Sequence, residues 1–473
     1  MPNDSKDAMD ALITDTLVVT CDASRRVIEH GAVAVRGDRI AAVGTSSDLE
    51  QKYTELPRIA GRGLATLPGF INAHTHTALT VLRGSIEDFD GDVIYGYMSP
   101  VSYTMTGEER AVMVQMGCLE ALRSGCATLV DPFRHVPTYG KQMAATGMRL
   151  WLSENCADIN TLNIRKGDYS EDRAFGQVFL DRTIEMIETL HDTHAGRVKC
   201  QIAAHAPDNC SPWMLDQLQT LGQRYGLTRT VHLAQSLQEV KVVREARGGR
   251  TPAEYLDGEG WLGPDLVGAH WTFCTEKDID LLARRGVQMV HCPANSSRRG
   301  PHRVLIGRIQ DAGINIALGT DNMTEDMFHA MKIGLILARG GRGREREGGC
   351  DPLPQALLDG ITVNAARSVG AEDAIGSIEA GKKADLTLID LDVPAMRPLI
   401  NPVSTLVHYG HPGIVHSVMV DGTFLLRERN VLAFDERALL REAQAVTQAV
   451  WTRMLAANPD IPPPPGGLAW LDA

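Results

Sequence analysis

Two histidines, His74 and His76, are separated by a single residue at the end of an apolar run. Side chains two positions apart on a strand point to the same face, so both imidazoles can bind one metal ion from one side. The run from Leu64 to Ile71 is typical of a buried strand, and Pro68 and Gly69 indicate a turn just before the pair. Such pairs also occur without metal, so residues further along the chain must decide.

Three more residues of ligand type follow later in the chain. His232, His270 and Asp321 each come at the end of a short apolar run that is typical of a strand. In a barrel of parallel strands the carboxyl ends of the strands converge on the active site, so these residues and the histidine pair would share one cup. Three or four nitrogen and oxygen ligands with an open position for water describe a catalytic divalent metal. A lone histidine at a strand end is more often structural, but five such residues favour a metal site.

Strand-like and helix-like stretches alternate through the middle of the chain. Besides the strand before His74, the predicted strands are Ala127–Val130, Arg149–Leu152, Val198–Ala203, Thr228–His232, Leu266–Ala269, Gln288–His291 and Ile314–Leu318. Amphipathic stretches of helical length separate them. This alternation predicts an α/β fold built on a distorted (β/α)₈ TIM-like barrel.

Both chain ends have β-type patterns instead. Residues 1–66 contain strand-like runs with a hairpin turn at 37–38, and residues 371–473 contain further strand-like runs and a helix predicted over 436–458. We expect the two ends to form one small composite β-sandwich domain beside a barrel over residues 67–370. The composite domain would then be closed by the two ends of the chain.

The composition is that of a globular protein without a nucleic-acid or membrane partner. A formal net charge of −12 over 473 residues disfavours binding to nucleic acid or anionic lipid. No run approaches the roughly 20 apolar residues of a membrane span, and the polar first residues do not resemble a signal peptide. Nine cysteines without CxxC spacing fit a reducing cytoplasm. We expect a cytoplasmic protein that takes a small-molecule substrate and forms a homodimer or a larger homo-oligomer.

The segments around these residues resemble the amidohydrolase superfamily along nearly the whole chain. The matching segments are Leu67–His76, His232-Leu233-Ala234, Ala269-His270, Gly319-Thr320-Asp321-Asn322, Asn364–Arg367 and Gly376–Asp385. Within the superfamily the chain looks like the branch of triazine hydrolases, cytosine and guanine deaminases, and phenylurea and thiocarbamate hydrolases. The resemblance implies the same barrel with a composite β-sandwich.

The resemblance also implies a set of metal ligands. One divalent ion per chain would be held by His74, His76, His232 and Asp321, with His270 beside the bound water or the substrate. Zinc is the usual ion in such sites, and Fe²⁺ or Co²⁺ also suit imidazole-rich ligation. No carboxylated lysine is evident at the place of a bridging ligand, which favours one metal over two.

One position departs from the deaminases of this branch. They carry His-x-x-Glu after the fifth strand, where the glutamate moves a proton to the leaving amine, whereas this chain has Gln235 three residues after His232. An amide can form hydrogen bonds but cannot act as a general acid. Either the leaving group needs little protonation, or another acid substitutes. His270, Asp321 and Glu239 are the candidates, although Glu239 is expected on the solvated face of the following helix.

Four further residues are predicted to line the substrate pocket. His205 and Asp208 lie in a segment that resembles the family's fourth-strand segment, where a histidine helps to position substrate. An Asx turn is an equally good interpretation of Asp208. Leu82 follows the first metal loop, and Trp271 follows His270, where packing is the competing role of the indole.

Together these features predict a metal-dependent hydrolase. Asp321 would accept a proton as ligand and base, His270 would stabilise the oxyanion, and Gln235 would contribute hydrogen bonds only. The favoured substrate is a urea, carbamate, thiocarbamate or amide with a weakly basic leaving group. The alternative is hydrolytic deamination or dechlorination of an aminoheterocycle such as a purine, pyrimidine, pterin or triazine. A non-catalytic metal-binding protein of the same fold is a third possibility, which the intact ligand set disfavours.

Overall fold

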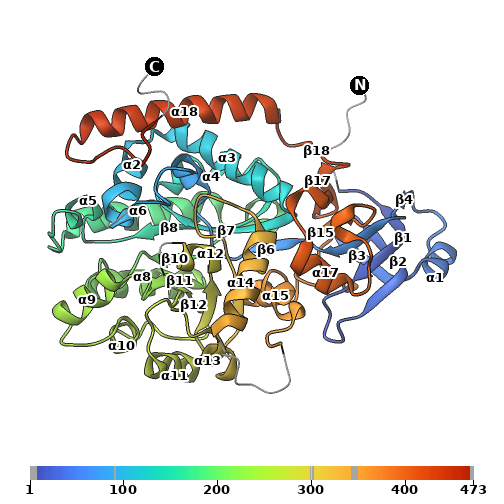
Figure 1. Ribbon diagram of the computed structural model, residues 1–473, viewed down its shortest axis with the longest axis horizontal. Coiled ribbons are helices and arrows are strands. Elements are labelled where there is room, and N and C mark those ends of the chain that lie inside the picture. The colour runs from blue at the N-terminus through green and yellow to red at the C-terminus, as the bar shows by residue number, and fades with distance from the viewer. Residues whose placement is uncertain (1–7, 90–91, 299, 301–302, 342–349, 469–473) are drawn as a thin grey trace.

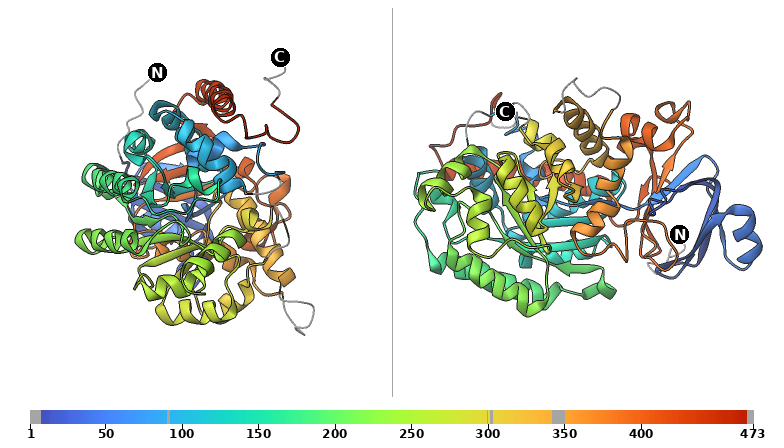
Figure 2. Two further views of the ribbon diagram at one scale, coloured as in Figure 1. Left: turned by 90° about the vertical axis from the view of Figure 1, so that its left-hand side faces the viewer. Right: turned by 90° about the horizontal axis from the view of Figure 1, so that it is seen from below.

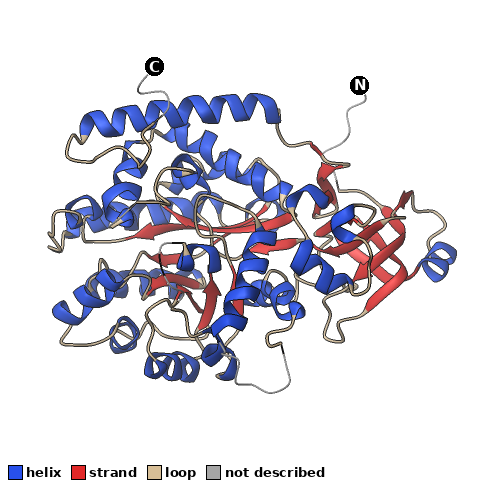
Figure 3. Ribbon diagram, viewed as in Figure 1, coloured by secondary structure: helices blue, strands red, loops and turns tan. Residues whose placement is uncertain are grey.

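A computed structural model describes residues 8–89, 92–298, 300, 303–341 and 350–468 of the chain. Figure 1 shows a barrel surrounded by helices on the left and a smaller part on the right, and Figure 3 shows that strands dominate the smaller part. Helix α18 (Glu436–Ala457) lies along the top of the barrel in this view. The predicted α/β fold, a distorted barrel with a composite domain from both chain ends, is confirmed.

The barrel is a parallel sheet with the strand order β14-β13-β12-β11-β10-β8-β7-β6, and β9 pairs with β8. Its strands are β6 (Phe70–Asn72), β7 (Cys126–Phe133), β8 (Arg149–Cys156), β9 (Val198–Cys200), β10 (Ile202–Ala204), β11 (Arg229–Leu233), β12 (Leu266–His270), β13 (Gln288–His291) and β14 (Ile316–Leu318). Every predicted strand is therefore present, but the single strand predicted over Val198–Ala203 is divided at Gln201 into β9 and β10. Main-chain hydrogen bonds join β14 to the β6 segment, where Ala73 N donates to Leu318 O at 3.0 Å.

Helices surround this sheet on the outside (Figure 2). They are α2 (Ser99–Thr104), α3 (Gly107–Arg123), α4 (Gly140–Ala144), α5 (Thr161–Ile164), α6 (Arg173–Leu190), α7 (Thr193–Gly196), α8 (Pro212–Tyr225), α9 (Leu237–Ala246), α10 (Pro252–Gly258), α11 (Glu276–Arg285), α12 (Pro293–Ser297), α13 (Ile306–Asp311), α14 (Met327–Gly341), α15 (Pro354–Gly360) and α16 (Val363–Ser368). Local sequence sets their ends. Helix α11, for example, begins with a Thr275/Asp278 capping box and ends at Gly286 in the left-handed conformation. Among the described residues, no helix has the length and apolarity that crossing a membrane requires.

The composite domain is one sheet to which both chain ends contribute strands. Its order is β18-β17-β16-β15-β5-β1-β2-β3, with β4 paired to β1. The strands are β1 (Ala11–Val19), β2 (Val27–Arg36), β3 (Arg39–Thr45), β4 (Arg58–Ala60), β5 (Leu64–Pro68), β15 (Leu386–Asp390), β16 (Val415–Val420), β17 (Thr423–Arg427) and β18 (Asn430–Val431), accompanied by helices α1 (Ser46–Lys52) and α17 (Pro402–Tyr409). The antiparallel pairing of β5 with β15 connects the two ends of the chain.

The apolar run from Leu64 to Ile71 is two strands rather than the single strand expected. Strand β5 belongs to the composite sheet and β6 to the barrel, and Gly69 is the residue between them. A Cβ on Gly69 would lie 2.4 Å from the Cβ of Ala127, so only glycine permits this close approach. Both strands are buried and apolar, and this is why their sequence pattern is continuous.

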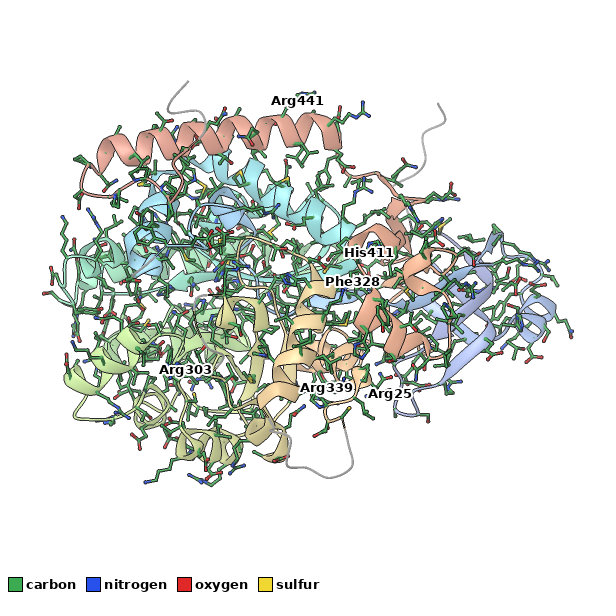
Figure 4. The ribbon with its side chains drawn as sticks, viewed as in Figure 1. Arg25, Arg303, Phe328, Arg339, His411 and Arg441 are labelled. Atoms are coloured by element: carbon green, nitrogen blue, oxygen red, sulfur yellow. The ribbon has the colours of Figure 1, made fainter. Side chains whose placement is uncertain are left out.

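A buried arginine ties the barrel to the composite domain. Arg149, at the start of β8, donates to Asp385 through Nε at 2.6 Å and through Nη2 at 3.0 Å, and it also bonds Asp421. All three side chains are at most 8% exposed. Removing one member of such a buried charged group is costly, because the remaining charges lose their partner without regaining water. Arg25, labelled in Figure 4, makes a second link through Asp359.

Arg149→Met should therefore lower the free energy of unfolding by about 3–5 kcal/mol, since it leaves the buried carboxylate of Asp385 without its cation. Asp421 would keep Lys383 at 3.4 Å and Arg197 at 3.6 Å. Urea denaturation followed by circular dichroism measures the change. Arg285→Met is the matched control, because Arg285 pairs with Asp257 at the surface and its removal should change stability little. Equal stability of the Arg149 variant and the wild type would contradict the structural role of this group.

Candidate metal centre and substrate cavity

Four predicted ligands meet at the carboxyl ends of the barrel strands. His74 and His76 follow β6, His232 lies in β11, and Asp321 follows β14. The Nε2 atoms of His76 and His232 are 3.2 Å apart, and Asp321 Oδ1 lies 3.3 Å from His76 Nε2 and 3.8 Å from His74 Nε2. Ligands of one tetrahedral zinc ion with bonds of ~2.0–2.1 Å are separated by ~3.3 Å. Two overlapping groups, His74–His76–His232 and His74–His270–Asp321, have ligand atoms within 4.8 Å of one another and so have the dimensions of a metal site.

The orientation of the imidazoles also fits a metal. His232 Nδ1 lies 2.6 Å from the carbonyl oxygen of His205, which assigns the proton to Nδ1 and leaves the Nε2 lone pair for a ligand. The Nε2 atoms of His74 and His270 are buried and have no hydrogen-bond partner among the described residues. Buried polar atoms are nearly always paired, so these two point to a missing partner. His270 and Asp321 also have positive φ angles of 78° and 68°, a strain typical of functional positions.

Burial keeps these histidines neutral, which is the form that binds metal. It lowers the pKa of His232 to about 4 and holds the pKa values of His74 and His76 well below their usual value, with neighbouring histidines adding to the effect. Burial has the opposite effect on the carboxyl of Asp321 and raises its pKa to about 7. Because the histidines are already neutral, a divalent cation would displace a proton at few of these ligands when it binds.

A buried hydrogen-bond network fixes the loop that carries the histidine pair. Glu325, which is fully buried, accepts hydrogen bonds from Thr75 Oγ1 at 2.6 Å and from Asn72 Nδ2 at 2.8 Å. Asn72 Nδ2 also donates to Thr320 Oγ1 at 2.7 Å. Sequence reasoning missed Glu325, since no spacing rule links it to the histidines. Asn295, whose Nδ2 donates to Asp321 Oδ2, was missed for the same reason.

A cavity of about 390 Å³ opens over the cluster. His76, His232 and Asp321 line it together with the predicted His205, Gln235 and His270. Its remaining described lining is Leu79, Val93, Ile94, Met98, Ser99, Ser102, Phe133, Arg134, Asn155, Ser236, Leu237, Thr272, Phe273, Asn295, Ser296, Gly300, Arg303 and Asn322. Such a volume suits a molecule of drug or nucleoside size.

Three predicted substrate contacts lie outside this lining. Leu82 and Trp271 are buried in the main hydrophobic core, and Leu79 takes the place expected for Leu82. Asp208 is buried outside the lining, and its Oδ2 accepts a hydrogen bond from the Tyr95 hydroxyl at 2.7 Å. Burial raises the pKa of Asp208 to about 6. Trp271 and Leu82 follow cavity residues in the chain, but their side chains pack away from the site.

The Asp208 segment orients His205. Asn209 Oδ1 accepts the main-chain N–H of Ala206 at 3.1 Å, which fixes the orientation of the amide. Asn209 Nδ2 then donates to His205 Nδ1. A neutral imidazole that accepts at Nδ1 carries its proton on Nε2. His205 is therefore set to donate a hydrogen bond from Nε2.

Glu239 is not solvated, contrary to expectation. Only 1% of the residue is exposed, and its carboxylate accepts the main-chain N–H groups of Ala234 and Gln235, each at 2.7 Å. Burial raises its pKa well above the usual value. Glu239 holds the turn after β11 and is not among the described residues that line the cavity. It therefore sets the position of Gln235 rather than reaching the substrate.

Comparison with known proteins agrees with this geometry. Residues 65–425 match the model of the Amidohydrolase family, and residues 31–55 match the imidazolonepropionase-like composite domain of bacteria. The chain is 31% identical over 460 residues to 5-methylthioadenosine/S-adenosylhomocysteine deaminase of Nitratidesulfovibrio vulgaris, with 95% of this chain and 99% of the relative covered. It is 26% identical over 453 residues to 5'-deoxyadenosine deaminase of Methanosarcina mazei, with 94% and 99% covered.

A solved structure resembles the chain over a similar length. An adenosine deaminase from Xanthomonas campestris, crystallised with bound zinc, superposes with a TM-score of 0.83 and is 25% identical. The match covers 95% of this chain and all of the other. The barrel and the composite domain are therefore shared with a zinc-containing protein.

The ligand assignment predicts different effects for two cavity histidines. His74→Ala should remove most of the bound metal, because it deletes one of four ligands. His205→Ala is the matched control: its Nδ1 is engaged by Asn209, so this variant should keep about one ion per chain. Metal analysis of the purified proteins measures both. Full metal content in His74→Ala, or loss of the metal in His205→Ala, would contradict the assignment.

Proposed function

The chain belongs to the amidohydrolase family, and from this premise we propose that it is a metal-dependent deaminase of an aminoheterocycle related to the purine nucleosides. The family makes it a hydrolase of carbon–nitrogen bonds other than peptide bonds. The reaction would replace an exocyclic amine on the ring by oxygen and release ammonia. The full-length similarity to deaminases of 5'-deoxyadenosine and of 5-methylthioadenosine carries this proposal.

Residues of the site supply the required functions. We propose zinc as the ion held by His74, His76, His232 and Asp321, in line with the zinc-bound adenosine deaminase structure. When bound, a divalent ion supplies a Lewis acid that lowers the pKa of a water molecule toward ~7. His205 would hold the heterocycle by donating from Nε2 to a ring nitrogen or oxygen. His270, whose Nε2 is unpaired, would hydrogen-bond to the oxygen that adds to the ring.

The proton that passes from the attacking water to the leaving amine cannot be carried by residue 235. Gln235 lines the cavity and cannot carry a proton, and Asp321 is the only carboxylate among the described residues of the lining. Asp321 would therefore take the proton of the attacking water and return it to the leaving amine. Asn295 holds the Oδ2 atom of this carboxylate and so orients it. Ammonia cannot leave readily as an anion, so this transfer is the step on which the proposal depends.

A second function is favoured by Gln235 itself. A urea, carbamate, thiocarbamate or amide with a weakly basic leaving group would not need a dedicated acid at this position. The same metal centre and cavity would serve this reaction. We rank it second because it has no support from the full-length relatives named above.

A substrate panel separates the two functions. Zinc-loaded protein should release ammonia from at least one member of a set containing 5'-deoxyadenosine, 5'-methylthioadenosine, S-adenosylhomocysteine, adenosine and guanine, with kcat/KM above about 10⁴ M⁻¹s⁻¹. Phenylurea and phenyl carbamates form the second arm. Ammonia assays and the ultraviolet spectrum of the product measure turnover. Hydrolysis confined to the second arm would replace the deaminase by the second function.

Gln235→Glu tests the proton route. A carboxylate beside the cavity should increase ammonia release about 10- to 100-fold, part of the ~10²–10⁴ that general acid–base catalysis can contribute. Gln238→Glu is the matched control, because Gln238 lies exposed in α9 and bonds Tyr169. Metal content must be equal in all three proteins. If the Gln235→Glu variant turned over at the same rate as the wild type, proton transfer would not limit the reaction.

A further inference from the structure

Arg134 is a buried cation in the wall of the cavity without a carboxylate partner. It lies just after β7, is 5% exposed and lines the cavity. Its Nη1 donates to Ser99 Oγ at 3.2 Å, and its guanidinium stacks over the ring of Tyr103 at 5.2 Å. No ion pair within 4.0 Å joins it to any carboxylate in the described part of the chain. A buried charge normally has a counter-charge, because desolvation costs several kcal/mol per ion.

The nearest carboxyl groups are already engaged. Glu154 is close enough for the charge of Arg134 to favour its ionised form, but its two oxygens accept the main-chain N–H groups of His135 and Val136, each at 2.8 Å. Its closest cation is Arg182, at 3.8 Å. Asp321 is bonded to Asn295 and lies among the metal-ligand histidines. Neither group neutralises Arg134.

The described lining of the cavity therefore carries more positive than negative charge. Its described lining contains the cations Arg134 and Arg303 and a single carboxylate, Asp321. Arg303, labelled in Figure 4 on the barrel side of the molecule, is exposed and stacks on Phe273. A divalent ion at the histidine cluster would make the cavity more positive still. Arg134 lines the same cavity as His76, His205 and His232, so its charge lies beside the reaction centre.

We propose that Arg134 binds a carboxylate group of the substrate, so that the enzyme selects anionic over neutral heterocycles. This inference rests on the proposed function for the heterocyclic ring of the substrate, but not for the negative charge of the substrate. A guanidinium offers two parallel N–H donors to a carboxylate, and Nη1 of Arg134 already uses one donor on Ser99. The remaining donors have no protein acceptor among the described residues. The substrate carboxylate would supply the counter-charge that the fold leaves out.

Binding of two isosteric probes tests the proposal without turnover. Isothermal titration of the zinc-loaded protein should show benzoate binding at least 10-fold more tightly than benzamide. Arg134→Met should weaken benzoate at least about 30-fold and leave benzamide unchanged, as expected for the loss of a buried charge partner. Arg134→Lys, which keeps the charge, should retain most of the preference. Arg303→Met is the matched control and should change benzoate affinity less than 3-fold.

The result is independent of whether the protein deaminates anything. Equal affinity of the wild type for benzoate and benzamide would overturn the proposal, even if no Arg134 variant folds. Unchanged benzoate affinity in a zinc-replete Arg134→Met protein would also overturn it, since the carboxylate would then be held by the metal alone. Thermal melting and zinc analysis of each variant accompany the titrations.

Discussion

The site depends on the closure of the barrel between its last and first strands. Asp321 N donates to His74 O at 2.9 Å, and His76 N donates to Asp321 O at 2.6 Å, so the two ends are paired as in a parallel sheet. This pairing places the Asp321 carboxylate against both histidines of the first loop. Gly319 permits it, because a Cβ there would lie 2.6 Å from His74 O. Hydrogen bonds from Asn72 and Thr75 to the buried carboxylate of Glu325 then hold the histidine loop in place.

Because the barrel is a closed sheet of buried parallel strands, much of its fold could be predicted from the sequence. The positions of the barrel strands and the residues at their ends could be predicted, since buried parallel strands appear as apolar runs and ligands follow them. The division of the Val198–Ala203 run into β9 and β10 could not. Nor could the split of the run at Gly69, because both strands are apolar and only the close approach to Ala127 separates them. The pocket side chains were less predictable. Trp271 directly follows the cavity residue His270, and Leu82 comes three residues after Leu79, but local turns direct both side chains into the core.

Glu239 shows the limit of helical pattern arguments. A carboxylate in the first turn of a surface helix is usually solvated, but here it lies between the helix and the turn after β11. Two main-chain N–H groups replace its water. Such a role depends on the backbone of a neighbouring turn, which no spacing in the sequence encodes. The same argument applies to Arg134, whose missing counter-charge becomes visible only when the cavity is assembled.

Zinc K-edge X-ray absorption on the zinc-loaded protein tests the central claim most directly, namely that barrel closure builds a site for one ion. The account predicts three imidazole nitrogens and one carboxylate oxygen at ~2.0–2.2 Å, an open position filled by water, and no metal–metal scattering near ~3.5–4 Å. A sulfur shell, a second metal, or fewer than three imidazoles would contradict it.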